Sequence, residues 1–197
     1  MKLFGVFRPS ARNSQADALY RVIVTQARSP RFYTGCGVPD TPDGRYDLIV
    51  LHVVLVLRRL HRAPEKTRKL AQAVFDLLFS DMDQNLREMG VGDLAVGKRI
   101  KAMAKGFYGR LAAYDGALTS ADEGALAAAL RRNLYRHADP PQRQVEAVAA
   151  YMRREAAHLD ERPLEELAAG RLGFGAAPDP EPTCPAVAEE KERASDG

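Results

Sequence analysis

The segment from Phe75 to Leu118 holds most of the residues whose types and spacing could support chemistry. Within it, Gly92–Lys98 has the spacing of a phosphate-binding loop, in which backbone amides and a lysine hold phosphate groups. However, Arg99 stands where that loop needs a serine or threonine for magnesium, and a helical pattern precedes the segment where a strand is required. The pattern therefore does not predict a nucleotide site, and we interpret Lys98 as the first basic residue of an exposed helix face.

Three polar residues between Phe75 and Gly92 resemble the first ligands of a calcium loop. Asp81, Asp83 and Asn85 alternate as that loop requires, but its sixth position is leucine instead of glycine and its twelfth is glycine instead of glutamate. A calcium loop is therefore not expected. The simpler interpretation is an acidic helix face on which Asp83 pairs with Arg87, four residues later.

The histidines and cysteines do not indicate a metal or catalytic site either. No two of the four histidines have ligand spacing on one helix, and the sequence offers no base to activate Cys36 as a nucleophile. We therefore expect no catalytic residue, no metal and no cofactor. One enzyme alternative stays open, a helical enzyme acting on a lipid or isoprenoid. It would need a paired-aspartate metal motif that Asp81 and Asp83 only partly provide.

The charge of the chain favours an anionic partner. Formal net charge is +3 over 197 residues, but residues 176–197 carry six acidic side chains against two basic ones, which leaves about +7 for the rest. Such an excess suits an anionic membrane, ribosomal RNA or an acidic protein, although most basic residues simply keep a surface solvated. A basic adaptor for a membrane or for ribosomal RNA is therefore an alternative function, and we expect no DNA partner.

The apolar segments and cysteines favour a cytoplasmic location. Only five residues separate Lys2 from Arg8, whereas the apolar part of a secretory signal needs about 7 to 15. The longest apolar run, Leu48–Leu57, is interrupted by His52 and is far shorter than the roughly 20 residues of a membrane span. Two cysteines do not make a disulfide framework and are typical of a reducing compartment.

Hydrophobic spacing predicts an all-α fold, a single bundle of about six to seven helices. The expected helices begin near residues 13, 46, 64, 93, 120, 140 and 163. Between the first two lies Gly35–Asp47, a stiff Gly/Pro segment that is either a functional loop or a turn-rich linker. We divide the chain into an extension (1–12), a helical domain (13–172) and an acidic Pro/Ala-rich tail (173–197). This tail is expected to be disordered, because its apolar surface is too small to offset the entropy of ordering it.

The helix expected from Asp93 has two distinct faces. One is apolar from Val96 to Tyr114, and the other carries three lysines. Gly106 and Gly109 interrupt this helix, and each costs up to about 1 kcal/mol of helix stability relative to alanine. Such glycines permit close approach, either of a core helix or of a partner.

Two blocks of the chain together resemble the ubiquinol-cytochrome c chaperone family. They are YRVIVTQARSPRFYTGCGVPDTPDGRYDLIVLH (Tyr20–His52) and FDLLFSDMDQNLREMGVGDLAVGKRIKAMAKGFYGRL (Phe75–Leu111), and the similarity covers roughly residues 15 to 160. The resemblance implies an all-helical chaperone, not an enzyme, that binds newly made cytochrome b and promotes assembly of ubiquinol-cytochrome c reductase. It also implies a bacterial member that acts in the cytoplasm at the inner face of the membrane, because no long transit segment precedes the matching region.

A surface that holds a membrane-protein client should combine apolar patches with charge. We expect the loop Gly35–Asp47 and the two helices around Gly90 to supply it, with Phe107 and Tyr114 shaping the surface or the core beneath it. The residues expected at the partner-binding site are Asp40, Asp47, Asp83, Arg87, Lys98, Lys101, Lys105, Phe107, Arg110 and Tyr114.

Overall fold

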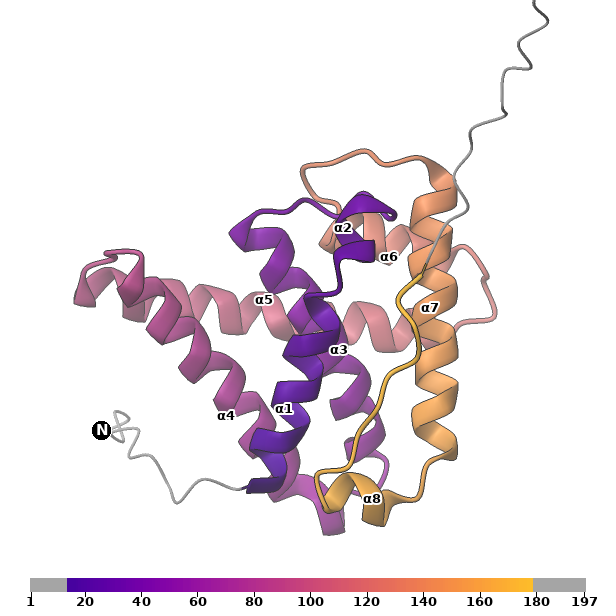
Figure 1. The fold of residues 1–197 in the computed structure, drawn as a ribbon, viewed down its shortest axis with the longest axis horizontal. Coiled ribbons are helices and arrows are strands. Elements are labelled where there is room, and N and C mark those ends of the chain that lie inside the picture. Colours follow the sequence, from indigo (N-terminus) through magenta and orange to yellow (C-terminus); the bar gives the residue numbers. More distant parts are fainter. Residues whose placement is uncertain (1–13, 179–197) are drawn as a thin grey trace, which may run out of the picture.

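The computed structural model describes residues 14–178, and this part of the chain forms eight helices and no strand (Figure 1). The helices are α1 (Ser14–Ala27), α2 (Pro30–Thr34), α3 (Pro42–His61), α4 (Pro64–Glu88), α5 (Asp93–Thr119), α6 (Ala125–Asn133), α7 (Gln142–Glu161) and α8 (Leu164–Ala168). The prediction of an all-α bundle is confirmed.

The core is built around α3. Fourteen of its twenty residues are buried, and a helix that is apolar on all sides must be surrounded by others. Accordingly, α3 packs against α1, α4, α5 and α7, and it lies at the centre of the bundle in Figure 1. The apolar run Leu48–Leu57 is therefore a core segment, as predicted. Within the described residues, no helix has the length and apolar character needed to span a bilayer.

The start of α3 differs from the prediction. Pro42 begins the helix four residues before the expected Tyr46, because Thr41 caps it: the Thr41 hydroxyl accepts the N–H of Gly44 at 3.1 Å. A proline is favourable at the first helical position, where its missing N–H is not needed. The connection before α3 therefore ends at Thr41, and the short helix α2 ahead of it was not predicted.

The helices α4 and α5 form a hairpin whose turn projects from the body, at the left of Figure 1. Gly90, with φ of +79°, ends α4 in a Schellman motif, in which the Val91 N–H donates to the Leu86 carbonyl at 3.0 Å. Near the middle of both helices, the Phe75 ring of α4 packs edge-on against Phe107 of α5 with ring centroids 5.3 Å apart. We call the part beyond these aromatic rings, residues 80–106, the arm.

Met89 lies at the tip of the arm. The helical spacing of the apolar residues in α4 would point Met89 toward the core, but it is 57% exposed. The helix ends at this turn, where the body no longer offers neighbours. Met89 therefore places an apolar side chain on the surface of the arm.

Residues 171–178 run without helix alongside α7, as the yellow segment of Figure 1. The Phe174 ring lies 5.0 Å from the His52 ring between centroids, and the Gly175 N–H donates to the buried Glu155 carboxylate at 2.9 Å. This segment packs on the helical body, although the tail was expected to begin at residue 173. The expected extension (1–12) and the rest of the tail (179–197) lie outside the described residues.

Candidate functional site

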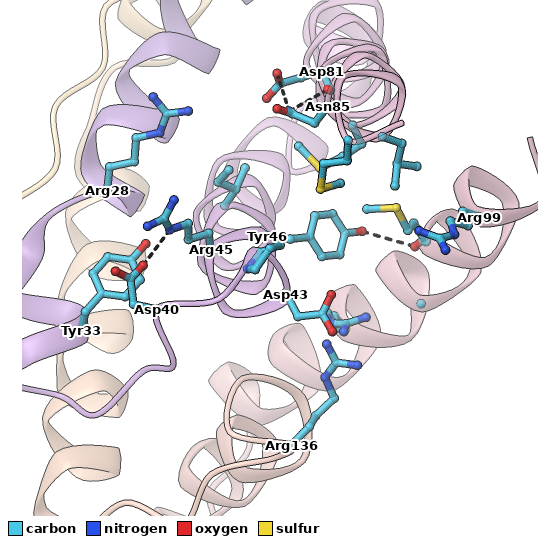
Figure 2. Close-up of a pocket in the computed structure, with 18 of the residues that line it drawn as sticks. Arg28, Tyr33, Asp40, Asp43, Arg45, Tyr46, Asp81, Asn85, Arg99 and Arg136 are labelled. Atoms are coloured by element: carbon cyan, nitrogen blue, oxygen red, sulfur yellow. Dashed lines mark hydrogen bonds and ion pairs between the residues drawn. The ribbon is translucent and has the colours of Figure 1, made fainter. Parts of the chain in front are cut away.

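A groove of about 1120 Å³ lies between the arm and the body (Figure 2). Most of its lining comes from α2, the connection after α2, the first turns of α3, the end of α4 and the arm half of α5. Arg28, between α1 and α2, and Arg136, after α6, also line it. Its apolar lining includes three methionines, Met82, Met89 and Met103. Tyr46 lies in the middle of Figure 2, and its hydroxyl donates to the Met103 carbonyl at 3.4 Å. Burial raises the pKa of Tyr46 to about 12, so the phenol is neutral.

The groove also gathers positive charge. Five arginines from different parts of the chain line it, Arg28, Arg45, Arg99, Arg110 and Arg136. Arg45 pairs with Asp40 at 2.7 Å, and this hydrogen bond lowers the pKa of the Asp40 carboxyl. Because arginine binds carboxylates in bidentate geometry, the arrangement suits an acidic ligand.

Asp47 lies beneath the groove as a buried charge. Its side chain is 2% exposed, and its two carboxylate oxygens lie 2.8 Å from Arg110 and 2.8 Å from Arg136. Burial raises the pKa of Asp47, while both arginines oppose this shift. The Arg110 guanidinium also lies over the Tyr46 ring, 5.9 Å from its centroid. These contacts correct the prediction for Asp47 and Arg110, because their side chains connect α3 to α5 instead of facing a partner.

Phe107 and Tyr114 are fully buried. Of the two roles left open for them, the structure gives the core role. The other predicted contact residues lie at the surface. Arg87 pairs with Asp83 at 2.6 Å and also contacts Asp93 at the start of α5.

The outer face of α5 is a second candidate surface. Lys98, Lys101 and Lys105 are exposed there, between Leu94, which is 96% exposed, and Tyr108, which is 58% exposed. Spacings of four, three, four and three place these five residues on one side of the helix, and we call them the lysine face. Leu94 and Tyr108 were not predicted as site residues, although continuing the lysine spacing in both directions would have found them.

Gly106 and Gly109 of α5 have different explanations. A Cβ at Gly106 would lie 2.8 Å from the Arg110 guanidinium, so this glycine makes room for the buried ion pair. A Cβ at Gly109 would meet nothing within 4 Å. No core helix of residues 14–178 therefore requires Gly109, and the partner alternative stays open for it.

We predict that Gly109→Ala raises the free energy of unfolding by up to about 1 kcal/mol, because alanine is the better helix former. Urea unfolding measures the change.

Gly44→Ala is the opposite case and should destabilise the protein, because the added Cβ would lie 2.1 Å from the Pro39 carbonyl oxygen. A loss of stability in Gly109→Ala would show that its backbone packs more tightly than the structure indicates.

The segments that resemble a phosphate-binding loop and a calcium loop do not adopt the structures of such loops. Helix α5 begins at Asp93, so Gly92–Lys98 forms no phosphate loop. Asp81 accepts the Tyr20 hydroxyl at 2.8 Å and the Asn85 amide at 3.1 Å. No cluster of three or more His, Cys, Asp or Glu within residues 14–178 is placed to hold a metal ion.

Residues 34–174 match the model of a protein family described as ubiquinol-cytochrome C chaperone. The chain belongs to this family. The match includes the whole lysine face and all of the groove that follows residue 33. The resemblance of Tyr20–His52 and Phe75–Leu111 to this chaperone family is thereby confirmed. The family is one of chaperones and assembly factors, which is not an enzyme class.

Individual relatives agree with this family. Ubiquinol-cytochrome c reductase complex assembly factor 1 of Mus musculus and that of Homo sapiens are each 28% identical over 149 residues, which is 76% of this chain and 50% of the relative. The chain thus spans about half the length of these two relatives. The crystal structure of the Cbp3 homolog from Brucella abortus is similar with a TM-score of 0.77 and 40% identity, over 85% of this chain and 92% of that one.

Proposed function

We propose that this chain binds newly synthesised cytochrome b and promotes its assembly into ubiquinol-cytochrome c reductase. The observation that carries the proposal is the family match over residues 34–174, supported by relatives that are named assembly factors of that complex. The proposed client is a membrane protein, so its emerging segments combine apolar stretches with charged ends.

The groove and the lysine face have the mixed character that such a client needs. Methionine side chains adapt their shape to different apolar surfaces, and three of them line the groove beside arginines. The proposed contact residues are those that remain at the surface, Asp40, Asp83, Arg87, Lys98, Lys101 and Lys105. Beneath them, the Asp47 ion pairs and the aromatic contacts of Phe107 hold α5 against α3 and α4.

One observation favours a second function. The three lysines of the lysine face are exposed, and a lysine near an anionic membrane contributes about 1 kcal/mol to binding. A basic adaptor for such a membrane or for ribosomal RNA would lose affinity steeply with salt and would show no preference for one client.

The proposal predicts that a triple variant, Lys98→Glu, Lys101→Glu and Lys105→Glu, captures less cytochrome b by a factor of about ten or more. The reason is that like charges across an interface are strongly unfavourable. To measure this, the variant gene replaces the original gene in the native organism, and the tagged protein is purified from membranes. Cytochrome b bound to it and assembled reductase are then quantified. An alternative terminal oxidase serves as the internal reference.

A matched control changes the charge by the same amount elsewhere. Lys66→Glu, Arg68→Glu and Lys69→Glu alter three exposed residues near the start of α4, away from the arm. This control should retain capture and assembly. Equal losses in both variants would favour the general adaptor, and unchanged reductase in a strain lacking the gene would refute the assembly function.

A further inference from the structure

We infer that the acidic segment Asp179–Gly197 binds back into the groove when no client occupies it. The inference rests on the proposed function only in treating the groove as the client site. It makes this segment of the chain a competitor for the surface that captures the client.

The groove has cationic groups that the described part of the chain leaves available. Arg28 and Arg99 line it, and neither forms an ion pair with a carboxylate of residues 14–178. Arg110 lies deeper, 8% exposed and held by Asp47, so it is not counted among them. A carboxylate entering the groove would gain charge-assisted hydrogen bonds to the exposed Arg28 and Arg99.

The acidic side chains of the groove do not cancel this charge, because five arginines line it against three aspartates, and the buried Asp47 adds only one more carboxylate. Asp40 pairs with Arg45, and Asp43 lies near Arg136 (Figure 2). Positive charge therefore remains at Arg28 and Arg99, at the opposite ends of the view in Figure 2.

The described chain ends close to the groove. The Pro178 carbonyl accepts from the Cys36 thiol at 3.7 Å, and Thr34, two residues before Cys36, lines the groove. The acidic segment therefore starts within about 15 Å of the rim. Its nineteen residues can extend over about 60 Å, so reach does not limit binding.

The composition of this segment complements the groove. Its acidic residues are Asp179, Glu181, Glu189, Glu190, Glu192 and Asp196. Only Lys191 and Arg193 oppose them, which leaves a net charge of −4. Prolines at positions 180, 182 and 185 favour an extended backbone that loses little entropy on docking. Acidic, rich in proline and partly apolar in composition, this segment suits a groove with arginines and methionines.

The chain carries natural probes for a test. Three of its five methionines line the groove, and Met152 is buried in α7. Cys184 lies in the acidic segment, whereas Cys36 is 0% exposed. A nitroxide attached to Cys184 of the full chain should therefore report, through broadening of methionine methyl NMR signals, whether the segment lies in the groove.

We expect the signals of Met82, Met89 and Met103 to lose most of their intensity. A neutral-tail variant, with all six acids replaced by their amides, should restore them, and so should Arg28→Glu with Arg99→Glu. Melting temperatures would show that these variants stay folded. Full groove signals in the native chain, or equal broadening in the neutral-tail variant, would overturn the inference.

The client-capture assay separates this inference from the proposed function. The NMR experiment contains no client, so its failure leaves client binding untouched. The neutral-tail variant should capture more cytochrome b than the native chain, because the competitor is removed. Groove occupancy without any gain in capture would contradict competition, while a native chain that captures no client would refute only the proposed function.

Discussion

Asp47→Ala is expected to lower the free energy of unfolding by about 3 kcal/mol, because it leaves two guanidinium groups beneath the groove without their carboxylate. Arg110 is 8% exposed, so its unpaired charge would stay largely buried. The Arg136 side chain is 34% exposed and can turn outward. The expected loss is therefore at the lower end of the roughly 3 to 5 kcal/mol that breaking a buried ion pair costs. Urea unfolding at neutral pH measures the change.

Asp40→Ala is the matched control for Asp47. Its carboxylate also pairs with an arginine, but the two side chains are 58% and 61% exposed, and surface pairs contribute less than about 1 kcal/mol. A similar, small effect for both substitutions would mean that the buried network does not hold α3 to α5. A large loss for Asp47 alone would confirm that role.

The stability of the protein should fall by about 3 kcal/mol through His52 alone as the pH drops from 6.5 to 4. Complete burial lowers the pKa of His52 from 6.5 to about 4. Its Nδ1 lies 2.8 Å from the Leu48 carbonyl, which can only accept, so Nδ1 carries the proton. The neutral Nε2 then accepts the Tyr151 hydroxyl at 2.8 Å. Protonation would place a charge in a site that offers it no counter-ion.

The sign follows from proton binding. Between pH 6.5 and 4 the unfolded chain holds more protons on this histidine than the folded chain, so unfolding is favoured as the pH falls. The contribution becomes complete and constant about one pH unit above 6.5, where this histidine is neutral in both states. Carboxylates titrate in the same range, so the comparison uses variants: the native protein should lose about 3 kcal/mol more than His52→Gln.

An exposed histidine supplies the control for this experiment. His158 lies on the surface of α7, so His158→Gln should keep the pH dependence of the native protein. Equal pH dependence in the native protein and His52→Gln would show that His52 accepts a proton in the folded state as readily as in the unfolded one.

Local sequence was sufficient to predict most helices and several surface features. Gly90 was expected to end a helix, and it does so through a left-handed backbone and a Schellman motif, which depend only on neighbouring residues. The spacing of Lys98, Lys101 and Lys105 was likewise sufficient to place them on one exposed face, because the helical period alone decides it.

Errors arose where packing decides the outcome. Asp47 was expected at the partner-binding surface, as part of the loop Gly35–Asp47. Its partners Arg110 and Arg136 come from α5 and from the segment after α6, and no local pattern links them to α3. Phe174 was assigned to the tail because its neighbours are glycine, alanine and proline, yet it packs against His52.

The sequence by itself therefore determined the all-α class, where most helices begin, the basic face of α5 and the resemblance to a chaperone family. The first three follow from contacts between residues a few positions apart, and the resemblance follows from two long blocks of sequence, Tyr20–His52 and Phe75–Leu111. Only the tertiary structure decided which charges are buried, that the arm stands off the body, and that a groove with arginines and methionines lies between them. That division has a physical reason: a helix sets the direction of its own side chains, whereas burial and ion pairing depend on which distant helices pack beside it.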